Sequence, residues 1–90
     1  MASLLFNVTA AGQVGALGPR QVGAVVLTGG SAAATLTLYS GTSTSDEKKV
    51  TLKAATNSCS VAQFECAVFP GGVYADISGT GAEAAVEIAG

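Results

Sequence analysis

The 90-residue chain contains no histidine and no tryptophan, and charged residues make up only 11% of it. A typical globular domain has a charged share of about 25%. Histidine is the commonest general base and a frequent metal ligand, so its absence excludes the usual histidine-dependent nucleophilic centres. The composition therefore predicts a protein that is not an enzyme and that uses no cofactor and no metal.

Positive charge is scarce as well. The cationic side chains are Arg20, Lys48, Lys49 and Lys53, and the formal net charge is −2. A nucleic-acid-binding protein needs a basic patch that neutralises phosphates. No such patch is available, and we expect no binding to nucleic acid.

Long hydrophobic runs are missing. The apolar run nearest the N-terminus, Leu4 to Phe6, is too short and has no basic region before it, so it does not resemble a signal peptide. No segment approaches the ~18 uninterrupted apolar residues of a membrane span. The sequence therefore predicts a chain made in the cytoplasm that does not enter a membrane.

The two cysteines, Cys59 and Cys66, are too far apart along one strand to form a disulfide. Seven extended residues span about 23 Å, well beyond disulfide reach. An internal bond would need a hairpin at Ala62 and Gln63, which are poor turn formers. We favour free thiols that pack as small hydrophobes, with a bond to a neighbouring subunit or an internal bond as the alternatives.

The acidic residues are scattered and form no recognisable motif. A glycosidase-like pair or a calcium site would require several of them to meet across neighbouring strands. The favoured interpretation is that outward strand positions carry charge for solubility and against edge pairing. The residues concerned are Asp46, Glu47, Glu65, Asp76, Glu83 and Glu87.

Short segments with apolar and polar residues in alternation fill most of the chain, separated by Gly, Ser, Thr or Asn. This period of two is the signature of half-buried strands. The predicted strands are residues 4–9, 21–28, 32–40, 48–55, 58–66, 73–78 and 82–89.

Two of these segments illustrate how clear the pattern is. Residues 32–40 place Leu36 and Leu38 on one face and threonines on the other, as a half-buried strand requires. Residues 58–66 are less regular, because Val61 and Phe64 fall on opposite faces unless a bulge intervenes.

The fold class predicted is all-β: a compact antiparallel β-sandwich or jelly-roll-like barrel of six to eight strands. Residues 1–20 form an N-terminal strand or arm followed by an irregular Gly-rich loop, and residues 21–90 form the sandwich. The whole chain is expected to be a single domain.

Three stretches, residues 25–41, 50–55 and 72–88, resemble a family of small phage-encoded all-β virion-associated proteins. The resemblance lies in turns and alternation, and no catalytic or binding residue carries over from it. It implies a virion structural protein, most simply a capsid decoration (cement) protein that docks on the head lattice and stabilises it. The implied partners are the major capsid protein or other virion subunits, and the implied location is the virion.

The N-terminal segment is the predicted contact region, because an arm is adaptable and its backbone donors can extend a partner's sheet. An equally weighted alternative is that residues 4–9 simply supply an edge strand. Self-association into a homo-oligomer is also open. The partner-binding residues predicted here are Leu4, Leu5, Phe6, Val14, Leu17 and Arg20.

A competing function is a receptor- or carbohydrate-binding module of a tail fibre or spike. Such sites combine aromatic platforms with polar loop residues. In this chain that interpretation depends on Tyr39, Tyr74 and the loop at residues 41–47. Another head–tail structural subunit, or one that polymerises through its sheet edges, is a third class.

Overall fold

The computed structural model describes residues 3–15 and 20–89, and the regular structure of these residues is entirely β-strand. This confirms the all-β prediction. The strands are β1 (Ser3–Val8), β2 (Gly12–Val14), β3 (Arg20–Thr28), β4 (Ala34–Ser40), β5 (Glu47–Ala54), β6 (Cys59–Phe69), β7 (Val73–Ser78) and β8 (Glu83–Ala89).

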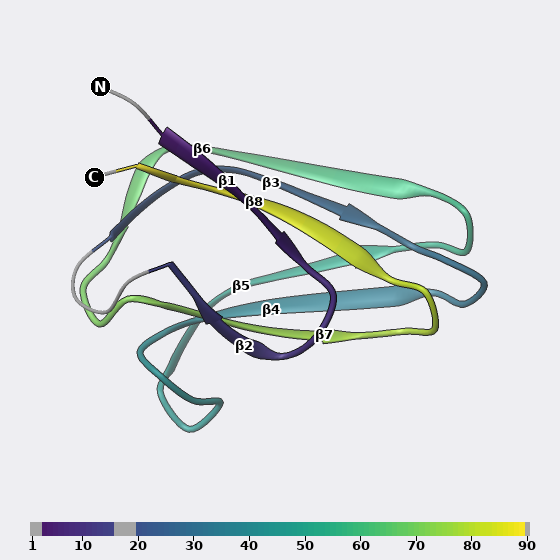
Figure 1. The fold of residues 1–90 in the computed structure, drawn as a ribbon, viewed down its shortest axis with the longest axis horizontal. Coiled ribbons are helices and arrows are strands. Elements are labelled where there is room, and N and C mark those ends of the chain that lie inside the picture. Colours follow the sequence, from purple (N-terminus) through teal and green to yellow (C-terminus); the bar gives the residue numbers. More distant parts are fainter. Residues whose placement is uncertain (1–2, 16–19, 90) are drawn as a thin grey trace.

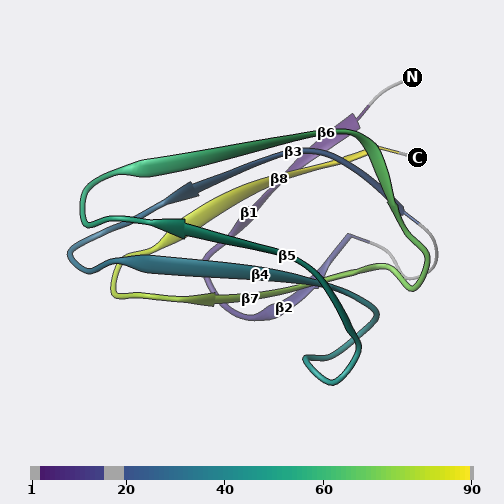
Figure 2. The same cartoon turned by 180° about the vertical axis from the view of Figure 1, so that it is seen from behind.

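The strands form two four-stranded antiparallel sheets that lie face to face (Figures 1 and 2). We call them sheet A, with the order β1-β8-β3-β6, and sheet B, with the order β2-β7-β4-β5. The first strand pairs with the last, the second with the seventh, the third with the sixth and the fourth with the fifth. The chain is thus one long hairpin rolled up on itself, which is the jelly-roll arrangement of a β-sandwich.

The termini of the described chain lie side by side because β1 pairs with β8, with Ser3 opposite Ala89 (Figure 1). The radius of gyration is 12.0 Å. A single compact domain of this length is expected at about 12 Å. Residues of both the N-terminal segment and the remainder of the chain therefore belong to one body.

The core lies between the sheets and is filled by the inward residues of the alternating segments. Leu36 and Leu38 are fully buried, whereas the adjacent Thr35 and Thr37 are half-buried on the outer face, as the alternation predicted. The largest fully buried side chains are Phe69, Leu27, Leu36, Leu38, Val22, Val25, Val73 and Val86.

Residues 12–14 differ from the prediction of an irregular loop. They form β2, in which Gly12 lies opposite Ala75 and Val14 opposite Val73. Val14 is also buried in the core. A segment of three residues that includes a glycine is too short for its alternation to predict a strand. Its extended conformation is stabilised by pairing with β7.

The sixth strand extends beyond the predicted residues 58–66 and ends at Phe69, which was expected in a turn. Its register against β3 shifts between Val22 and Ala24, which lie opposite Ala67 and Gln63. The two extra residues of β6 form a bulge that restores the inward direction for Ala67 and Phe69. Pro70 and Gly71 then make the predicted turn.

Among residues 3–15 and 20–89 there is no helix of the length and apolarity needed to cross a membrane.

Candidate interaction surfaces

Among the side chains that the structure describes, no three Cys, Asp or Glu lie close enough together to hold a metal ion. Asp46, one of the scattered carboxylates, accepts hydrogen bonds from the backbone amides of Thr42 (2.8 Å) and Ser43 (3.1 Å). These hydrogen bonds stabilise the loop that contains Asp46. The remaining candidate features lie on the surfaces of the two sheets.

The outer face of sheet A carries the large hydrophobic side chains that the described structure leaves exposed. They are Leu5 on β1 and Val61 and Val68 on β6, with exposed fractions of 70%, 60% and 54%. Phe6 beside Leu5, and Ala67 and Phe69 on either side of Val68, pack in or against the core. The strand geometry therefore turns all three toward solvent.

An apolar row that begins at Val61 crosses sheet A. Val26 on β3 lies opposite Val61 on one side and opposite Ala85 of β8 on the other. Because residues in register on adjacent strands have neighbouring side chains, the row is continuous over three strands. We call the outer face of sheet A, with Leu5, Val26, Val61, Val68 and Ala85, the apolar face.

Charge is distributed unequally between the two sheets. The three lysines of the chain all lie on β5, the edge strand of sheet B. On the described part of the apolar face, the charged side chains pointing outward are Glu83 and Glu87 of β8. The apolar face is therefore free of lysine and weakly acidic.

The four edge strands of the two sheets differ in how well they are protected against pairing with another strand. Strand β5 carries lysines and a register shift, β6 is bulged, and β2 has only three residues, and each of these features discourages pairing with another strand. Strand β1 has six residues in unbroken register with β8 and contains no Lys and no Pro. No described strand pairs with its outer edge, so β1 borders the apolar face as a regular, unprotected edge.

The outer face of sheet B is polar and contains both tyrosines. Tyr39 on β4 and Tyr74 on β7 lie directly opposite each other, with ring centroids 6.4 Å apart and the rings inclined at 61°. Gln13 on β2 continues this row beyond Tyr74. In the next row, Asp76 lies opposite Thr37. We call this surface the tyrosine face.

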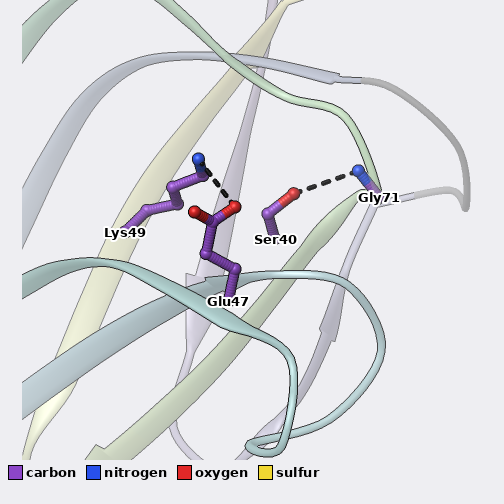
Figure 3. A network of polar contacts seen from close by, with 4 residues as sticks. All are labelled: Ser40, Glu47, Lys49 and Gly71. Atoms are coloured by element: carbon purple, nitrogen blue, oxygen red, sulfur yellow. Dashed lines mark hydrogen bonds and ion pairs between the residues drawn. The ribbon is translucent and has the colours of Figure 1, made fainter.

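The loop between β4 and β5, which the sequence linked to the tyrosines, lies at one end of sheet B. Ser40 precedes it, and its Oγ accepts a hydrogen bond from the Gly71 amide at 3.0 Å (Figure 3). After the loop, Lys49 Nζ lies 3.0 Å from Glu47 Oε1 (Figure 3). The first contact joins the end of β4 to the β6–β7 turn, and the second lies within the first turn-proximal residues of β5.

The structure separates the predicted partner-binding residues. Leu5 is exposed on the apolar face, whereas Phe6 packs on the core and Val14 is buried within it, so neither offers its side chain freely to a partner. Arg20 is half-buried at the start of β3. Leu4 is known through its backbone pairing with Ile88, and Leu17 lies outside the described residues.

Val61 and Val68 are surface residues that the sequence interpretation did not select. A signal existed for Val61, because its position opposite to Phe64 placed it on the outer face once Phe64 was assigned to the core. No sequence pattern placed Val68 on the outer face, because the direction of its side chain depends on the bulge in β6.

Cys59 is a free, exposed thiol at the beginning of β6. The side chain of Cys66, the proposed alternative partner, lies outside the described positions. The exposure of Cys59 corrects the expectation that this thiol packs as a small hydrophobe.

Comparisons of the chain with protein-family models, with curated protein sequences and with solved structures found no match.

Proposed function

We propose that this protein is a non-enzymatic structural subunit that docks through its apolar face on a repeating protein surface, as a capsid decoration protein docks on a phage head. The observation that carries the proposal is the outer face of sheet A, which exposes Leu5, Val61 and Val68 and has an apolar row from Val61 through Val26 to Ala85. Contiguous exposed apolar surface on a small soluble protein marks a protein–protein contact.

The partner is a protein surface of low charge. The apolar face has no lysine among its described residues, and the cores of protein interfaces are depleted in charged side chains. The unprotected edge of β1 adds backbone donors and acceptors beside Leu5, to which a strand of the partner can pair. A shell that repeats this partner many times converts a weak single contact into firm attachment.

The rigid body suits such a role. The jelly roll is used in viral capsid proteins as well as in lectins and cupins, so the fold by itself does not select among these functions. What favours the structural role here is the combination of that fold with an apolar face.

The test is attachment of purified chain to particles of the phage that encodes it, after removal of the resident copies. Val61→Lys places a charge in the apolar row of this face and is expected to lower the affinity by about tenfold or more. Thr51→Lys, an exposed position on sheet B, is the matched control and should attach within about twofold of the unmodified chain.

Thermal unfolding should first establish that both variants are folded. Attachment of the Val61→Lys variant at full strength would exclude the apolar face as the docking surface. Failure of the unmodified chain to attach to the stripped particles would count against the decoration role itself.

A further inference from the structure

We propose that the tyrosine face, on the opposite side of the molecule from the apolar face, is a binding site for a neutral glycan chain. The inference goes beyond the proposed structural role and does not depend on it. Sheet B forms its own layer, so its outer surface stays accessible when sheet A is covered (Figure 2).

The two tyrosines of the chain meet on this face although they are 35 positions apart in the sequence. Tyr39 and Tyr74 lie on the central strands of sheet B, and both are half-buried, so each ring keeps a solvent-accessible part. Because the rings are inclined at 61°, they cannot both lie flat on the sheet. The pair forms a step, and the apolar C–H face of a sugar ring can stack on the side of such a step.

Hydrogen-bonding groups surround the step. Gln13 lies beside Tyr74, and its Nε2 donates to the Val73 carbonyl at 3.1 Å, which fixes the amide and leaves its oxygen free to accept. In the adjacent row, the side chains of Asp76, Thr37 and Thr51 make no hydrogen bond or ion pair with the described residues.

Asp76 is the residue hardest to explain by the fold alone. Aspartate is depleted in strands, yet Asp76 is half-buried in the middle of β7 with no described side chain paired to it. A carboxylate that accepts two neighbouring hydroxyl groups of a sugar would account for its position. Charge-assisted hydrogen bonds of this type are the stronger ones.

The balance of charge favours a neutral ligand. Asp76 stands on β7 in the row beside the tyrosines and would repel an anionic glycan there, whereas Lys48 and Lys53 lie at the β5 edge of the face, opposite Tyr39 and Thr35. The face therefore offers acceptors, donors and aromatic surface together without a cradle for phosphate or carboxylate.

The absence of tryptophan makes the site easy to observe. The chain has two tyrosines and no tryptophan, so its tyrosine emission arises entirely from this face. The experiment titrates the full chain with laminarin, dextran and soluble xylan while recording this emission. We expect a saturable change with at least one of the three polysaccharides.

Variants then locate the binding. Tyr74→Ala and Asp76→Asn should each weaken binding by about tenfold, through lost stacking and a lost charged hydrogen bond respectively. Tyr74→Phe retains the ring and should bind within about threefold. Val61→Lys, on the apolar face, should bind as the unmodified chain does. Far-UV circular dichroism checks that each variant is folded. If the Tyr74→Ala variant does not fold, the Asp76→Asn variant still tests the proposal.

Three results would overturn the proposal. One is no saturable change with any of the three polysaccharides. Another is undiminished binding by folded Asp76→Asn and Tyr74→Ala variants. The third is a change in emission that follows protein concentration and accompanies dimerisation in sedimentation velocity, which would assign the tyrosine face to a second copy of the chain. None of these outcomes bears on docking through the apolar face.

Discussion

Leu36 and Thr37 are neighbours on β4, yet one side chain lies in the core and the other on the tyrosine face. Leu36 is fully buried between the sheets. Truncating a buried leucine removes its burial and leaves a cavity, so Leu36→Ala should lower the free energy of unfolding by about 2–5 kcal/mol. Thr37→Ala leaves the core intact and should cost less than about 1 kcal/mol.

Urea unfolding of both variants measures the difference. A domain of this size has a total stability of only about 5–15 kcal/mol, so the Leu36→Ala variant should unfold at a clearly lower urea concentration. Equal costs for the two substitutions would contradict the assignment of inner and outer faces on β4.

Gly79 is a second residue whose identity the fold requires. It follows β7 with a φ of +116°, and a Cβ built there would lie 2.6 Å from the carbonyl oxygen of Ala33. Both the backbone conformation and the contact exclude a side chain. Gly79→Ala should therefore destabilise the protein by about 1–3 kcal/mol.

Gly12 provides the matched control for that substitution. A Cβ at Gly12 meets no atom within 4 Å, and its backbone does not adopt a positive φ. Gly12→Ala should change stability by less than about 0.5 kcal/mol or raise it slightly. Thermal unfolding of the Gly79→Ala and Gly12→Ala variants compares their stabilities. A larger loss of stability for Gly12→Ala would refute the described packing.

At the scale of elements, β1 is part of the sandwich and also borders the apolar face. It pairs along its length with β8 and contributes Val8 to the core. Deleting residues 2–9 should therefore lower stability by about 3 kcal/mol or more, because β8 loses one of its two partner strands and the core loses Val8.

The Leu5→Thr variant separates the two roles of β1. It removes one exposed apolar side chain and retains a residue that favours strands, so unfolding should be nearly unchanged while attachment weakens. Cooperative unfolding of the deletion variant at the midpoint of the full chain would instead mean that residues 2–9 act as a dispensable arm.

The elements that could be predicted from the sequence are those with uninterrupted alternation. Residues 34–40, 73–78 and 83–89 lie within the predicted strands and turn the predicted side chains inward. Strand β2 could not be predicted, because a strand of three residues exists only through its pairing with β7. The full length of β6 was missed because the bulge at residues 64–66 breaks the period of two.

At the scale of the whole molecule, alternation determines which residues face inward but not which strands are neighbours. The jelly-roll order brings β4 beside β7 and so places Tyr39 opposite Tyr74. The sequence singled out both tyrosines, but their contact depends on a pairing between distant segments. The apolar face is a similar case, since it combines residues of strands from both ends of the chain.

The low charge of the apolar face predicts how the affinity of the chain for particles depends on salt concentration. Docking through an apolar face of low charge gains little from long-range electrostatic attraction. The affinity of the chain for particles should therefore change by less than about threefold between about 0.05 and 0.5 M NaCl. A steep fall in affinity with salt, measured by cosedimentation, would point instead to the lysines of β5 as the contact.

The proposal places this chain in a phage virion, and the measurement that tests this claim most directly is the copy number of the chain in purified particles of that phage, by quantitative mass spectrometry against the major capsid protein. A decoration protein that docks through the apolar face on a repeating lattice should be present in hundreds of copies per particle. About a dozen or fewer would indicate a fibre, neck or vertex module, and complete absence from the particles would contradict the structural role.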